Sequence, residues 1–161
     1  MRTKALDFGT SMNDTIDRLP LPLARVSAAL LLGVTWIIPA WNKLSAGGVP
    51  GGFAERFSGT FLASFPGIPA SYYSIAILEA IAGLLAVGSL LTGEFLPGKK
   101  APLIKAAVLL SILVFIQLGF GLRLTGDNDG AANLFTYTIG AFVLLLSLNW
   151  FEQRQTTESK N

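Results

Sequence analysis

Four long runs of apolar residues constrain what this chain can fold into more than any other feature of its sequence. A helix that crosses the roughly 30 Å hydrocarbon core of a bilayer needs about 20 residues. We place such helices near residues 23–44, 72–92, 102–123 and 133–151, and these runs leave no soluble domain large enough to bury them. The sequence therefore predicts an all-α integral membrane four-helix bundle, residues 23–151. An N-terminal segment, residues 1–22, precedes it and a tail, residues 152–161, follows it.

Composition excludes several kinds of chemistry. Of the 161 residues 52% are hydrophobic and 14% are charged, and the chain contains neither cysteine nor histidine. Both methionines, Met1 and Met12, lie before the apolar region, so the bundle lacks the usual protein ligands of haem, iron–sulfur clusters and zinc. We therefore expect no protein-bound metal and no electron transfer through a metal or thiol of this chain. The net charge of +2 gives no indication of nucleic-acid binding.

The basic residues predict how the bundle is oriented. With four spans, the N-terminal segment, the loop at 93–101 and the tail share one side of the membrane. Nine of the twelve basic residues belong to that side: Arg2, Lys4, Arg18, Arg25, Lys99, Lys100, Lys105, Arg154 and Lys160. The positive-inside rule therefore places both termini in the cytoplasm. Arg25 and Lys105 lie near span ends, where we expect their side chains to reach the membrane surface.

The longest loop, residues 45–71, carries phenylalanines at every fourth position: Phe53, Phe57, Phe61 and Phe65. This spacing places the four rings along one side of a helix, and glycine and proline flank the segment at both ends. We therefore predict a short amphipathic helix on the outer membrane surface between spans 1 and 2. It either caps the bundle or acts as a lid over an opening between helices.

Five polar side chains are predicted to converge in the outer half of the membrane. An ionisable group inside a span costs on the order of 2.5–3.5 kcal/mol on insertion scales, so it should face protein and have a partner. Glu79, in the second span, is the clearest case, and its helical neighbours are small residues that allow another helix to approach closely. The other four groups are Lys43, Gln117, Arg123 and Tyr137.

Two interpretations of this cluster remain open. One is a structural ion pair of Glu79 with Lys43 or Arg123, in which Gln117 and Tyr137 satisfy the remaining hydrogen bonds. The other is a ligand pocket, in which the cations hold an anion or a quinone carbonyl and Glu79 accepts a proton. Residues 123–130 are too short for an EF-hand calcium loop, and we interpret Asp127 and Asp129 there as turn formers.

Around these residues the sequence resembles the DoxX/DoxD-like family of small four-helix membrane proteins, over roughly residues 23–150. The resemblance is carried by Arg25, by Ala40-Trp-Asn-Lys43-Leu44 where the family has Gly-x-x-Lys-Leu, and by the phenylalanine-bearing loop. It is also carried by Ile77–Gly88, which is similar to the family's Glu-x-x-Gly-Gly helix. Ala40 replaces the family's glycine, and without cysteine any sulfur chemistry depends on another chain. The resemblance implies an inner-membrane protein, in some members the small subunit of a thiosulfate:quinone oxidoreductase.

Three functional hypotheses follow. The leading one is an accessory or anchoring subunit of a quinone-linked membrane redox complex. This subunit would not be an enzyme by itself. It would contact the lipid bilayer and other membrane subunits, with quinone as the candidate ligand near Glu79. The second is a purely structural assembly subunit without a ligand site. The third, a small anion carrier, is less favoured because the sequence shows neither an internal repeat nor paired broken helices.

Overall fold

Four long helices dominate the computed structural model, which describes residues 20–64 and 67–158. The predicted N-terminal segment therefore lies mostly outside the described residues. The elements, in chain order, are α2 (Pro20–Ser45), α3 (Gly51–Phe57), the 3₁₀ helix η1 (Phe61–Ser64), α4 (Gly67–Leu91), α5 (Pro102–Leu124) and α6 (Asn128–Glu158). Among the described residues, α2, α4, α5 and α6 are each long and apolar enough to cross a membrane. This confirms the predicted fold class.

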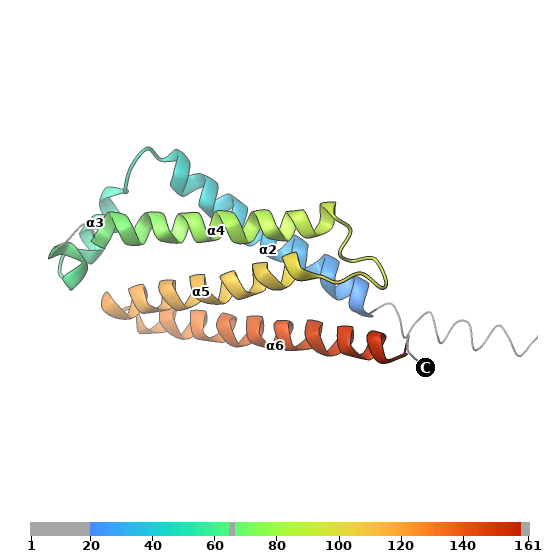
Figure 1. Ribbon diagram of the computed structural model, residues 1–161. Helices are drawn as coiled ribbons and strands as arrows, with labels where there is room; N and C mark the ends of the chain where they lie inside the picture. The colour runs from blue at the N-terminus through green and yellow to red at the C-terminus, as the bar shows by residue number, and fades with distance from the viewer. Residues whose placement is uncertain (1–19, 65–66, 159–161) are drawn as a thin grey trace, which may run out of the picture.

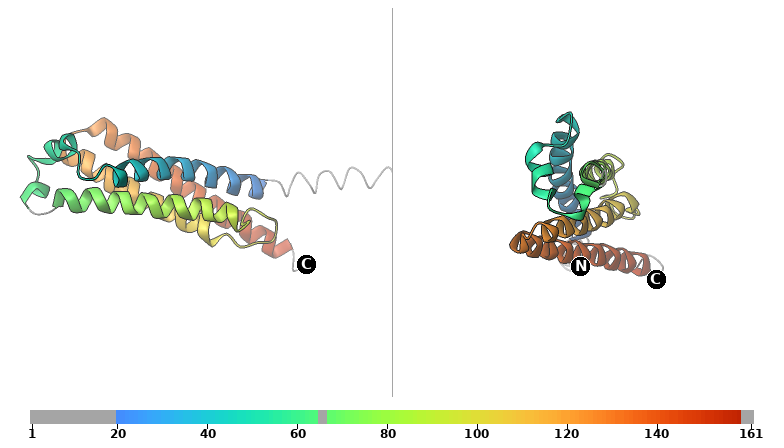
Figure 2. Two further views of the ribbon diagram at one scale, coloured as in Figure 1. Left: turned by 90° about the horizontal axis from the view of Figure 1, so that it is seen from above. Right: turned by 90° about the vertical axis from the view of Figure 1, so that its left-hand side faces the viewer.

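The long helices pack mainly in sequence order. The most extensive contacts join α2 to α4, α4 to α5 and α5 to α6, whereas α2 makes only a few contacts with α5 and α6 (Figure 1). The start of α2 and the end of α6 lie at the same end of the bundle as the α4–α5 loop, and we call this the terminal end. The opposite end, which we call the α3 end, carries α3, η1 and the α5–α6 turn (Figure 2).

The bundle is held together by small residues that let helices approach closely. Ala76, Ala82 and Ala86 on α4 have no exposed surface. A Cβ added to Gly83 would lie 2.6 Å from the Ile37 Cγ1 atom and 3.1 Å from the Ile37 backbone nitrogen. Because those distances are shorter than ordinary van der Waals contact, the α2–α4 crossing requires glycine at this position.

The last helix is longer than the predicted span at both ends. The sequence predicted residues 133–151, but α6 runs from Asn128 to Glu158. Asp127 is its N-cap: the carboxylate oxygen Oδ1 accepts a hydrogen bond of 2.9 Å from the Gly130 backbone N–H. At the other end, glutamate, glutamine and arginine are good helix formers, so the helix continues into the predicted tail.

The phenylalanine-bearing loop forms two short helical segments instead of one. The α-helix ends at Phe57, where the Ser58 hydroxyl donates to the Glu55 carbonyl and the Thr60 hydroxyl donates to the Phe57 carbonyl. Such local side-chain bonds compete with helix continuation. As a result Phe57 is buried, whereas Phe61, on η1, is 64% exposed. Phe65 lies outside the described residues.

Candidate functional site

Lys43 and Glu79 form an ion pair between two spans at the α3 end. The Lys43 ammonium, in the last turn of α2, lies 2.8 Å from each of the two Glu79 carboxylate oxygens. The Glu79 side chain is 2% exposed and that of Lys43 is 23% exposed. Of the two partners predicted for Glu79, the structure selects Lys43, which satisfies both oxygens of the buried carboxylate.

The other three predicted site residues lie elsewhere. The Gln117 amide nitrogen donates to the Ser74 hydroxyl at 2.6 Å, which joins α5 to α4. The exposed Arg123 guanidinium donates to the Asn128 side-chain oxygen. Tyr137 is 57% exposed, and its ring packs on Phe115 with ring centres 5.9 Å apart. The structure therefore does not bring the five groups together: α6 turns other residues, such as Ala141 and Leu148, toward the core.

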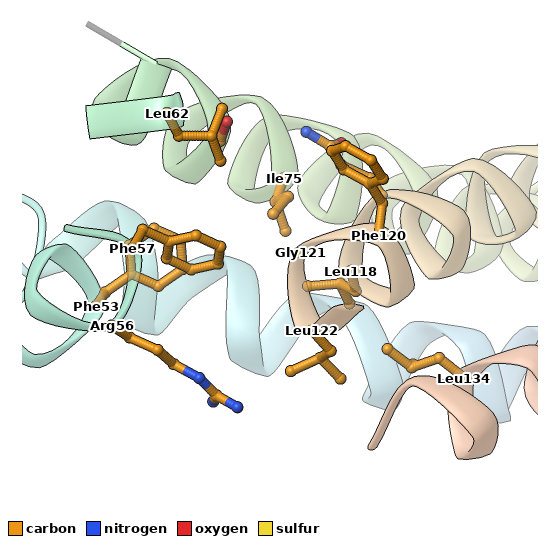
Figure 3. A pocket seen from close by; sticks show the side chains of 12 residues that line it. Phe53, Arg56, Phe57, Leu62, Ile75, Leu118, Phe120, Gly121, Leu122 and Leu134 are labelled. Carbon is orange, nitrogen blue, oxygen red and sulfur yellow. The ribbon is translucent and has the colours of Figure 1, made fainter. Parts of the chain in front are cut away.

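A largely apolar cavity of about 470 Å³ lies at the α3 end, between α3 and the ends of the long helices. Figure 3 shows Phe53, Arg56 and Phe57 on the α3 side, facing Leu122 and Leu134 across the cavity. Besides these five, the lining residues are Leu62, Ser71, Ile75, Gln117, Leu118, Phe120 and Gly121. Of the five predicted site residues, only Gln117 lines it, so the cavity is distinct from the Lys43–Glu79 pair.

The contacts that hold α3 over this cavity are both apolar and ionic. The Phe57 ring packs against α5 at Gly121, where an added Cβ would lie 3.4 Å from the ring. The Arg56 guanidinium donates to the Asp127 carboxylate at 2.8 Å, which ties α3 to the α5–α6 turn. The hydrogen bond from Gly130 and the Arg56 guanidinium lower the pKa of Asp127 below its ordinary value. The Phe53 ring also packs on the Tyr72 ring of α4, so two aromatic contacts and one ion pair anchor α3.

A polar network of several side chains lies at the terminal end. The prediction that Arg25 and Lys105 both reach the membrane surface was wrong for Arg25. Arg25 is 2% exposed and therefore does not reach the surface. Its guanidinium donates to the Glu94 carbonyl (2.7 Å), the Lys99 carbonyl (2.9 Å) and the Glu152 carboxylate (2.6 Å). Lys105, which is partly buried, also pairs with Glu152. Arg25 thus joins α2 to the α4–α5 loop and to α6.

Glu94 completes this network by capping α5. Its two carboxylate oxygens accept hydrogen bonds from the backbone N–H groups of Leu103 (2.8 Å) and Ile104 (3.0 Å). Those N–H groups belong to the first turn of α5 and have no partner within the helix. A glutamate shortly before Pro102, a residue typical of a first helical turn, is the one sequence signal that could have indicated this cap.

Metal-ligating groups do not cluster in the part of the chain that the structure describes. Within residues 20–64 and 67–158, no three carboxylates lie together in a way that could hold a metal ion. No family model, curated protein sequence or solved structure matches the chain.

Proposed function

We propose that the chain is a DoxX-like inner-membrane protein that acts as a small accessory subunit of a quinone-linked redox complex, with both termini in the cytoplasm. The observation that carries the proposal is the ion pair of Lys43 and Glu79 within the spans. A buried carboxylate in a span is costly and is typical of functional sites in membrane proteins. The distribution of basic residues supports the orientation.

The geometry defines what Glu79 needs in order to exchange a proton with a quinone. Both carboxylate oxygens are engaged by Lys43, so one of them must first be released. Lys43 is the partner able to move, because its ammonium is on the last turn of α2 and its side chain is 23% exposed. A partner subunit bound at the α3 end would supply the electron carrier that this chain lacks.

A second candidate, a purely structural subunit, is favoured by the same contact. A carboxylate whose two oxygens are fully paired needs no ligand, and the pair joins α2 to α4. In this view the chain anchors or orders its partner through its apolar helix faces, and Glu79 only stabilises the bundle.

Replacing Glu79 by Gln in the intact native complex separates the two functions. The complex is isolated in mild detergent, and its size, its extractable quinone and its quinone-dependent turnover are measured. Loss of quinone or turnover with the complex intact supports the redox role, whereas loss of assembly alone supports the structural role. Tyr137→Phe is the matched control, because Tyr137 is exposed and lies apart from the pair.

Two further measurements can overturn the proposal. Turnover of quinone by the purified chain alone, with a suitable electron donor, would show that it is not merely a subunit. Uptake of an anion into vesicles that contain only this protein would instead indicate a carrier.

A further inference from the structure

The cavity at the α3 end is large enough for a hydrocarbon chain. Its volume of about 470 Å³ falls within the range of roughly 300–1,000 Å³ that is usual for ligand pockets. Most of its lining is aliphatic or aromatic, with contributions from α3, η1 and three of the long helices. An apolar cavity of this kind favours an apolar occupant over water.

The cavity borders a surface that faces the hydrocarbon of the membrane. Phe120, one of its lining residues, is 55% exposed and lies on the apolar span α5. The ring of Phe61, on η1, lies 6.5 Å from the Phe120 ring and is also largely exposed. These two exposed rings place the cavity directly beside the hydrocarbon of the bilayer.

A cation lies at the edge of the same cavity, where the apolar span ends. Arg56 lines the cavity and its side chain is 46% exposed. A guanidinium carries five N–H donors, and the Asp127 contact uses the Nη2 group alone. The remaining donors match the planar fork with which arginine binds phosphate.

We propose that this cavity binds a membrane phospholipid, with one acyl chain between α3 and α5 and the phosphate on Arg56. The proposal requires only that the bundle spans a membrane, and it is independent of the redox role. A prenylquinone also has a long apolar chain, but it brings no anionic group to Arg56. The guanidinium donors of Arg56 that the Asp127 contact does not use therefore favour the phospholipid.

Photocrosslinking in vesicles tests this assignment. The full-length protein is placed in phosphatidylcholine vesicles that contain a trace of phosphatidylglycerol with a diazirine at the end of one acyl chain. The labelled residues are then identified by peptide mass spectrometry. We expect labels concentrated on cavity-lining residues such as Phe57, Ile75 and Leu118. Labels spread evenly over the exposed faces of α2 and α6 would overturn the proposal.

Two variant pairs make the test specific. Leu134→Trp fills the cavity and should reduce this labelling several-fold, while Leu146→Trp, on the lipid-exposed face of the same helix, should not. Arg56→Gln should reduce labelling by phosphatidylglycerol about tenfold, the effect of losing one charge-assisted contact, but not labelling by a diacylglycerol probe. Arg123→Gln, at an exposed arginine outside the lining, is its control.

Each contrary outcome overturns a stated part of the proposal. Equal losses for Arg56→Gln and Arg123→Gln would mean general attraction to anionic lipid without a built site. Displacement of the lipid probe by a small excess of unlabelled prenylquinone would assign the cavity to quinone. Circular dichroism in detergent verifies that each variant is folded. Leu134→Trp and Arg56→Gln change different parts of the cavity, so the two results are independent.

Discussion

The guanidinium of Arg25 and the carboxylate of Glu152 meet at 2.6 Å, although 127 positions separate them in the sequence. Arg25 is 2% exposed, so the contact lies inside the protein and not at the membrane surface. It joins the first and last described long helices, α2 and α6, which make few other contacts with each other. The buried Arg25 therefore provides a polar link between α2 and α6 at this end of the bundle.

Replacing Arg25 by Met should be strongly destabilising. The change removes the guanidinium that donates to the Glu94 carbonyl, the Lys99 carbonyl and the Glu152 carboxylate. Breaking a buried pair by removing one partner costs about 3–5 kcal/mol, which should appear as a lower unfolding midpoint in detergent. Arg154→Met, at an exposed arginine stacked on Trp150, is the control and should cost less than about 1 kcal/mol. Equal effects of the two variants would contradict the structural role of Arg25.

The Lys43–Glu79 pair should show strong and asymmetric coupling. Lys43→Met leaves an unpaired carboxylate that is 2% exposed, and we expect a cost of about 3–5 kcal/mol. Glu79→Gln leaves a lysine that is 23% exposed and able to turn toward water, so its cost should be smaller. The double variant should be more stable than the sum of the two single effects implies. A double-mutant cycle in detergent measures this, and simple additivity would show that the two groups do not interact.

Gly83 should tolerate no side chain. An alanine Cβ would meet Ile37 at distances that force α2 and α4 apart, and overpacking of this kind costs about 1–3 kcal/mol. Gly140→Ala is the matched control because nothing lies within 4 Å of its added Cβ, and the better helix propensity of alanine should leave stability unchanged or slightly higher. Thermal unfolding of both variants in the same detergent compares them. A stable Gly83→Ala protein would mean that the two helices are not in close contact.

The anchoring of α3 should weaken only in acid. The folded-state pKa of Asp127 lies below its ordinary value of 3.8, so the ionic part of the anchoring is fully present above that value and is lost as the pH falls through the lowered pKa. The exchange rate of the α3 amides, divided by the intrinsic exchange rate at each pH, should therefore be constant from pH 7 to about 5. This ratio should rise below the ordinary pKa of the carboxyl group. Asp127→Asn should show the faster exchange at every pH. A pH-dependent change that persists in this variant would point to another carboxylate.

The sequence alone predicted the elements that depend on local pattern. Runs of apolar residues are sufficient to identify spans, because a helix in lipid must satisfy its own backbone and present apolar side chains. Glu79 was identified for a similar reason: a carboxylate in a span requires a partner wherever the helices pack. The boundaries were less accurate, since the cap at Asp127 and the hydroxyl bonds of Ser58 and Thr60 act within a single turn.

Only the tertiary structure decided which groups meet. Helical spacing gives the face of a residue relative to its own helix, but the rotation of that helix in the bundle depends on close packing such as that of Gly83 on Ile37. The rotations of α6 and α5 leave Tyr137 and Arg123 exposed, whereas the rotation of α2 turns Arg25 into the protein. The cavity under α3 is likewise formed by segments distant in sequence. The sequence thus determined a four-span membrane bundle with one costly carboxylate, and packing determined its partner and the place of the cavity.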